Sequence, residues 1–468
     1  MILLYSFITK QSSYNLQKLI KIIDIEVDPF FTPHELDQLA SEAKFVQRKS
    51  KLNGQLFLDL IVFNSEDLKS QSLNDLAIAL HDRHHVEITK QSLHDRFNKY
   101  ALAFLKIALE KMLCKQIDSR FAFLKHFNGF NRILIKDSTC FQVHESLADC
   151  YPGSGGDGSA ASVRIQFEYD ILSGKINDLS VNAFNDQDAI DSVATIELTD
   201  KGDLIIRDLA YMSLEVLQLI ARQFAFYLCR AKPNIYIFEK KGAQYVKIDF
   251  VRETQYMKKR NIKCCEKEVY LGSKDKIKTR LILHLLPDQV VSERLRKAAI
   301  YNKKKGGKGL SKEYKAKAAL NLFITNTNQE QVPIRHVWEL YRLRWQIELI
   351  FKIWKSICNI EKVKKVKKER LECYIYSKLI LIVLMWQILC KTAKLLFDYE
   401  KKAISFFKAA NTLLKLKIKD LRDIFMLQKG NMQDFLSKFY NLSRTKHILE
   451  RHSNNSTSFE RMICCLTS

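Results

Sequence analysis

Apolar residues from Leu340 to Trp354 recur every three or four positions, which is the period of a helix with one face on a core. A second row with the same period is polar. At about 100° per residue its four side chains project within one sector beside the apolar stripe; they are Tyr341, Arg344, Glu348 and Lys355. The pattern predicts one helix over residues 341–355. Spacing alone leaves two interpretations of the polar row open: a solvated face with stabilising ion pairs, or a functional surface.

The chain before residue 125 is predicted to be helical. Apolar-rich stretches indicate helices at Leu56–Phe63 and Leu73–Leu80, and after a polar break at His84–Glu87 a further helix would begin at Thr89. That helix would carry Gln91, Ser92, His94, Arg96 and Lys99. Two helices joined by a short break, with polar and basic residues on the second, fit a helix-turn-helix DNA reader. An ordinary helical hairpin gives the same pattern.

Strand patterns begin near Arg132. Short β-branched or alternating runs predict, in order, a strand, a hairpin, a fourth strand and, after a helix opened by Ser213, a fifth strand; they lie at 132–136, 163–169 with 175–181, 204–207 and 227–229. Asp137 directly follows the first run and Asp208 directly follows the fourth. An acid at the end of the first and fourth strands, with a third acid from a later helix, is the order of a ribonuclease H-like core. Glu348 fills the third place.

Far more residues separate Asp208 from Glu348 than such a core needs. Alternating runs there predict strands at 234–239, 244–250, 268–271 and 280–286, with basic turns between them. The predicted fold class is therefore α/β, with a ribonuclease H-like core interrupted by a mainly β insertion. The predicted domains are a helical N-terminal domain (1–125), the first part of the core (126–232), the insertion (233–320), the second part of the core (321–390) and a helical C-terminal region (391–468), a candidate for dimerisation.

Composition narrows the class of partner. The 468 residues carry 76 Lys and Arg against 52 Asp and Glu, a net charge of +24, which indicates nucleic acid or an anionic membrane surface. The apolar run Leu379–Cys390 is too short to span a bilayer, which needs about 20 residues, and it contains Gln387. We therefore expect a buried helix there and no membrane association. No secretory signal is recognised at the N-terminus.

Cysteine and histidine usage does not indicate zinc or disulfides. The eleven cysteines are scattered without a CxxC pair, which fits a reducing cytoplasm, and His81, His84 and His85 are expected to be surface residues. Basic runs near Lys258, Lys303 and 361–370 are either solvated faces or phosphate contacts.

The gaps between Tyr341, Arg344, Glu348 and Lys355 match the YREK signature of a family of bacterial insertion-sequence transposases. Other segments are similar to those of the same family: Asp137 after RILIK, DLAY at 208–211, CRAK around Arg230 and FITN at 323–326. The resemblance covers roughly residues 70–390. Ala210 stands where glycine is common in the family.

This resemblance implies a DDE transposase in which Asp137, Asp208 and Glu348 hold two Mg²⁺ ions, with Mn²⁺ able to substitute, because hard divalent ions prefer carboxylate oxygens. Tyr341, Arg344, Lys355 and Arg230 would contact double-stranded DNA at the element ends. The enzyme would cut and join DNA through a hairpin-type intermediate, as a homodimer, in the bacterial cytoplasm near the nucleoid. An inactive or domesticated DNA-binding protein on the same fold remains the alternative, and the full YREK row disfavours a ribonuclease H-like nuclease acting on hybrids or junctions.

Overall fold

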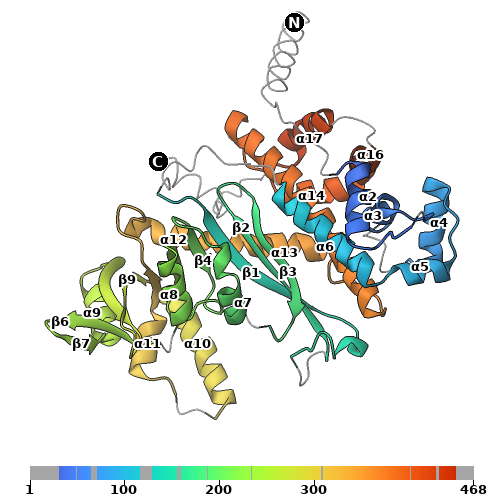
Figure 1. Ribbon diagram of the computed structural model, residues 1–468. Coiled ribbons are helices and arrows are strands. Elements are labelled where there is room, and N and C mark those ends of the chain that lie inside the picture. Colours follow the sequence, from blue (N-terminus) through green and yellow to red (C-terminus); the bar gives the residue numbers. More distant parts are fainter. Residues whose placement is uncertain are drawn as a thin grey trace, which may run out of the picture. The chain divides into compact units, whose positions relative to one another are not determined.

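The computed structural model (Figure 1) is a mixed α/β fold with one large sheet. It describes residues 31–48, 50–64, 71–115, 129–154, 160–186, 188–232, 235–306, 309–400, 402–427 and 432–448. The chain divides into two compact units. Unit 1 comprises Met1–Arg120, Phe141–Val163 and Leu349–Arg451, and unit 2 comprises Phe121–Cys140, Arg164–Glu348 and His452–Ser468.

The sheet has ten strands among the described residues, in the order β3-β2-β1-β4-β5-β10-β9-β8-β6-β7. The strands are β1 (Ile133–Gln142), β2 (Ser162–Asp170), β3 (Ile176–Ala183), β4 (Leu204–Arg207), β5 (Phe226–Arg230), β6 (Ile237–Lys241), β7 (Gln244–Lys247), β8 (Cys264–Leu271), β9 (Ile277–Leu285) and β10 (Leu320–Thr325). β4 is parallel to both β1 and β5, whereas β10 is antiparallel to β5 and β9. The central strands are apolar and buried, as expected for strands covered on both faces.

Most of the predicted strands are confirmed. β4 has the predicted bounds, and the β2–β3 hairpin turns at Gly174, whose φ of 75° suits glycine. One detail is wrong: β1 does not end at Asp137 but continues to Gln142. Its pairing with β4 ends at Lys136, opposite Arg207, and β1 continues beside β2.

Residues 235–320 are not mainly β, contrary to the prediction. The four predicted strands form as β6 to β9, and three helices lie between or after them: α9 (Phe250–Lys259), α10 (Asp288–Lys304) and α11 (Lys312–Ala318). The basic runs at Lys258 and Lys303 end α9 and α10 rather than forming turns. Lysines in the last turn of a helix interact favourably with the negative end of its dipole. These strands extend the same sheet as the core strands.

The segment 340–355, which carries the apolar and the polar row, is not one α-helix. It consists of α12 (Ile334–Arg342), a 3-10 turn, η4 (Leu343–Trp345), and α13 (Gln346–Ser356); α13 begins in unit 2 and ends in unit 1. The predicted apolar face is confirmed, since its six members are buried: Leu340, Leu343, Ile347, Ile350, Phe351 and Trp354. Unit 2 also contains α7 (Asp188–Ala194) and α8 (Leu214–Arg222), and Ser213 caps α8 as predicted.

Unit 1 is helical apart from short segments. Its helices are α2 (Pro33–Glu42), α3 (Gly54–Val62), α4 (Leu73–His84), α5 (Lys90–Arg96), α6 (Lys99–Cys114), α14 (Lys368–Glu400), α15 (Phe406–Leu416), α16 (Ile418–Leu427) and α17 (Met432–Lys446). α14 is long and apolar enough to cross a membrane by length and composition, but 89% of its most apolar window is buried inside the fold. The predicted buried helix is therefore confirmed.

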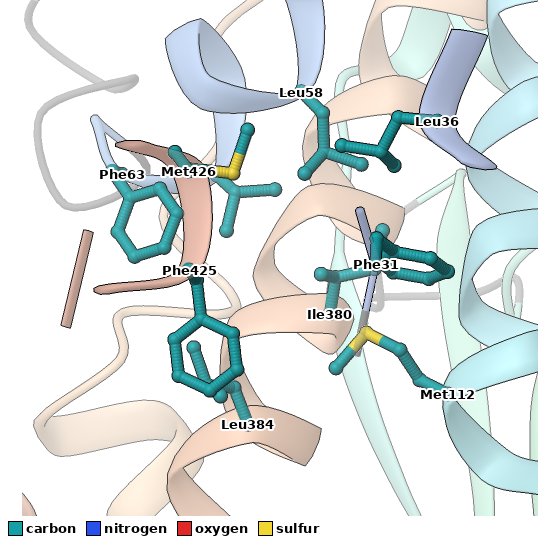
Figure 2. Close-up of a pocket in the computed structure, with 10 residues that line it drawn as sticks. Phe31, Leu36, Leu58, Phe63, Met112, Ile380, Leu384, Phe425 and Met426 are labelled. Carbon is teal, nitrogen blue, oxygen red and sulfur yellow. The ribbon is translucent and has the colours of Figure 1, made fainter. Parts of the chain in front are cut away.

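The core of unit 1 includes a small apolar cavity of about 20 Å³ (Figure 2), lined by side chains from α2, α3, α6, α14 and α16 and from the residues next to them. Figure 2 shows Phe31, Ile380 and Met112 facing the space from different segments. Its volume matches little more than one water molecule, and its lining offers a water no polar partners. We regard it as a packing defect.

The pair α4 and α5 has the predicted break, with His85 in the left-handed region (φ 53°) and Thr89 capping α5. Two side chains differ from expectation. Arg96 turns inward and donates to the carbonyl oxygens of Phe45 and Leu52, and His84 is not a surface residue, because its Nε2 lies 2.6 Å from the Asp59 carboxylate in the interior.

Candidate active site

Two acids lie side by side on neighbouring strands. Lys136 on β1 is in register with Arg207 on β4, so the next residues, Asp137 and Asp208, are adjacent at the point where the parallel pairing stops. Because side chains alternate along a strand, both acids point to the sheet face opposite Lys136 and Arg207. Repulsion between two adjacent carboxylates must then be offset by positive charge.

Burial of Asp137 raises its carboxyl pKa to about 6, and the negative charges of Asp208 and Asp188 act in the same direction. Two contacts oppose this shift. The backbone N–H of Ser138 donates to Asp137 Oδ1 at 2.9 Å, and Arg344 supplies a positive charge. With a pKa of about 6, the carboxyl group is mostly ionised at pH 7.

The segment α12–η4–α13 brings three polar residues to these acids. Arg344 Nη1 donates to Asp137 Oδ2 at 2.9 Å, and its Nη2 donates to Glu348 Oε1 at 3.4 Å. Tyr341 Oη donates to Asp208 Oδ1 at 3.4 Å. One guanidinium thus joins the first and third predicted acids, and the tyrosine one helical turn earlier contacts the second.

The two ends of this cluster differ in exposure. Arg344 is 8% exposed and Tyr341 is 2% exposed, so neither belongs to a solvated helix face. Burial disfavours the charge on Arg344, yet the carboxylates, Asp208 foremost, raise its pKa. Burial also raises the pKa of Tyr341, and the charge of Asp208 adds to it. The Glu348 side chain is 59% exposed and faces solvent.

Arg230 and Lys355 are the other two predicted DNA-contacting residues. Arg230 ends β5 and is close enough to Tyr341 for its charge to lower the tyrosine pKa. Lys355 lies near the end of α13, in unit 1, with its ammonium 3.7 Å from Glu361. Of the polar row, Tyr341 and Arg344 contact the strand acids and Glu348 contacts Arg344.

The chemistry of these donors suits a hard divalent cation, which prefers carboxylate oxygens. Asp137, Asp208 and Glu348 are the residues that would hold it. In the described part of the chain, no three acidic, histidine or cysteine side chains lie close enough together to enclose an ion as they stand. Arg344 lies among the three carboxylates and supplies the positive charge that they attract.

Sequence patterns did not reveal a second group of polar residues behind the strands. Ser138, Arg164, Gln166 and Asp188 form a connected set of hydrogen bonds next to Asp137. They come from β1, β2 and the start of α7, with no fixed spacing among them. The only local signal was the alternation of Arg164 and Gln166 on one face of the predicted hairpin.

Comparison with known proteins gives the same class. Residues 128–384 match the family described as Transposase DDE domain. The chain is 33% identical, over 93% of its length and 92% of theirs, to the transposase for insertion sequence element IS231F of Bacillus thuringiensis subsp. israelensis. It is 29% identical over 86% of its length, and 87% of the relative, to the transposase for insertion sequence element IS1151 of Clostridium perfringens. A sheet with paired acids and a match of this extent define a transposase. The chain belongs to the DDE transposase family of insertion sequences.

Proposed function

We propose that this transposase cleaves the ends of its insertion sequence by metal-dependent hydrolysis and joins them to target DNA, in a cut-and-paste reaction with Asp137, Asp208 and Glu348 as the catalytic acids. The observation that carries the proposal is the single guanidinium of Arg344 between Asp137 and Glu348, beside Asp208. Three acids distant in sequence thus lie around one positively charged side chain. A cluster of carboxylates destabilises a fold, because like charges repel. Phosphoryl transfer gives such a cluster a use.

The acids would hold two Mg²⁺ ions, or Mn²⁺ in their place. When bound, such ions activate the attacking oxygen and stabilise the leaving oxygen of a phosphodiester. Asp137 and Asp208 would supply metal ligands from fixed positions on the sheet, and the exposed Glu348 would complete the ligand set from α13. Arg344 would contact a DNA phosphate through its guanidinium fork, while Tyr341 orients Asp208.

We propose further that β1 to β5 and β10, with α13, make a ribonuclease H-like core and that residues 233–320 form an insertion within it. The helices before residue 125 would bind the inverted ends, with the pair α4 and α5 as the candidate helix-turn-helix. Arg230 and Lys355 would contact DNA, and the region 391–468 would support a homodimer on two element ends. A net charge of +24 suits double-stranded DNA as the partner, and the reaction would take place in the bacterial cytoplasm at the nucleoid.

The test is strand cleavage of a DNA fragment bearing the element's own inverted ends. Asp137→Ala should abolish cleavage in Mg²⁺ or Mn²⁺ and leave end binding nearly unchanged, because binding rests on phosphate contacts elsewhere. A matched control is Asp186→Asn, since the Asp186 carboxylate accepts only a backbone N–H, that of Ala183, among the described contacts. If Asp137→Ala cleaves as well as the wild type, the acids are not catalytic. If the wild type binds ends and never cleaves, the chain is a DNA-binding protein on this fold.

A further inference from the structure

Side chains of helix α7 contact both chain neighbours of Asp137. Asp191 of α7 pairs with Lys136 through Oδ2, and Asp188 at its start accepts a hydrogen bond from the Ser138 hydroxyl at 3.0 Å. Lys136 and Ser138 flank Asp137 and, by the alternation of β1, point to the face opposite it. Helix α7 therefore contacts β1 on the face opposite Asp137, at the residue before this acid and at the residue after it.

Asp188 is the centre of a network rather than the partner of a single group. Its Oδ1 accepts from Arg164 Nη1 at 2.6 Å and from Gln166 Nε2 at 3.0 Å, in addition to Ser138. Arg164 also donates to the Ser138 hydroxyl oxygen at 3.0 Å. Three hydrogen bonds to one carboxylate oxygen, one of them an ion pair with Arg164, fix the position of each donor.

The same network reaches the second acid. Gln166 Oε1 accepts a hydrogen bond of 2.7 Å from the hydroxyl of Tyr211, and both residues are fully buried. Tyr211 lies three residues after Asp208. On the preceding side, Arg207 donates at 2.8 Å to Ser192 of α7. The segments before and after Asp208 are thus connected to the same helix.

We propose that α7 positions the two strand acids, and that Asp188 is a positioning residue for Asp137 acting through Ser138. The inference rests on the proposed function of Asp137 as a catalytic acid. Besides adding negative charge near Asp137, Asp188 would fix the geometry of that acid. Phosphoryl transfer is sensitive to such geometry: a displacement of about 1 Å can cost on the order of 100-fold in rate.

The experiment compares Asp188→Ala, Asp188→Asn and Ser138→Ala in single-turnover cleavage of end DNA, with end binding and thermal unfolding measured on the same preparations. Asp188→Ala should cleave on the order of 10- to 100-fold more slowly at saturating DNA and bind ends with unchanged affinity. Asp188→Asn keeps an oxygen acceptor for Ser138 and should recover part of the rate. Ser138→Ala removes only a hydroxyl and should show a smaller loss in the same direction.

Asp186→Asn and Asp137→Asn complete the design. The first changes an aspartate two residues before Asp188 that lies outside the network, and it should behave as the wild type. If Asp188→Ala and Ser138→Ala cleave normally while Asp137→Asn is inactive, the positioning role is wrong and the proposed function stands. A normal rate for Asp137→Asn would overturn the proposed function itself. If Asp188→Ala does not fold, Ser138→Ala decides, and losses of cleavage and binding in equal proportion would also overturn the positioning role.

Discussion

Buried lysines in the two units have partners of different kinds. In unit 2, Lys136 lies against the carboxylates of Asp178 and Asp191, and the neighbouring Arg207 lies against that of Glu168. In unit 1, the ammonium of Lys378 donates, among the described residues, to two carbonyl oxygens, at 2.6 Å to Asn359 and 3.2 Å to Lys362. Carbonyl oxygens solvate a charge but do not neutralise it, and burial lowers the pKa of Lys378 to about 8.

The difference follows what each region has to hold. Lys378 stabilises the turn between α13 and α14, in which Asn359 has a φ of 51°. Neutral carbonyl oxygens are sufficient acceptors for this purpose. Lys136 and Arg207 fasten the rear of two strands whose opposite face presents adjacent carboxylates. Full ion pairs there fix the strands against repulsion between Asp137 and Asp208. Buried charge thus marks a structural turn in one unit and the support of the candidate active site in the other.

The largest expected effect comes from breaking the paired network. Lys136→Met should lower the free energy of unfolding by about 3–5 kcal/mol, because Asp178 and Asp191 lose their shared cation in the interior. Urea denaturation of the two proteins at pH 7 measures the difference. Lys297→Met is the control, since that lysine is exposed and pairs with Glu293 on a helix surface. An equally stable Lys136→Met variant would mean that the network does not support the strands.

A smaller effect, with a distinct pH dependence, is expected for Lys378. The folded-state pKa of about 8 lies below the ordinary value of 10.5, so the unfolded chain binds the extra proton between these values. Stability from this group is therefore fully present above pH 10.5 and is lost as the pH falls through 8. The unfolding free energy of the wild type should rise, relative to Lys378→Met, by roughly 3 kcal/mol from pH 8 to 10.5. A constant difference across this range would contradict the lowered pKa.

The smallest effect concerns DNA binding by the polar row. If Arg344 and Lys355 each contact one phosphate, replacing either by Ala should reduce the slope of log affinity against log salt by about 0.9. Tyr341→Phe should leave the slope unchanged, because it removes a neutral hydroxyl, and should slow cleavage through its bond to Asp208. Filter binding over a range of salt and single-turnover cleavage provide both numbers. If slopes and rates are unchanged in all three variants, these side chains have no role in DNA binding or cleavage.

Local chemistry was enough to predict many elements of the fold. The run at 204–207 became β4 because four apolar or long side chains between turn signals favour a buried strand. Thr89 and Ser213 capped helices because their hydroxyls accept from backbone N–H groups three residues on. The order of Asp137, Asp208 and Glu348 could also be placed on strands and a helix in advance.

Features that depend on distant partners could not be predicted. β1 continues past Asp137 because β2 pairs with it, although residues 138–142 have no strong strand pattern of their own. The 3-10 turn at Leu343–Trp345 preserves the spacing of apolar residues closely enough that periodicity does not reveal it. The contacts of α7 join residues 50 positions apart, such as Ser138 and Asp188, and no local pattern encodes them.

The register of β1 with β4 also limits how this gene can change length. In both strands a basic residue precedes the acid, so one sheet face receives the cations and the other the carboxylates. Deleting a single codon within residues 133–136 would leave the reading frame intact and shift Asp137 by one position, which exchanges the two faces of the strand. A carboxylate would then lie beside the buried acids Asp178 and Asp191, in the place of the lysine that pairs with them. Length changes of one residue in these strands should therefore be absent from active copies of the element.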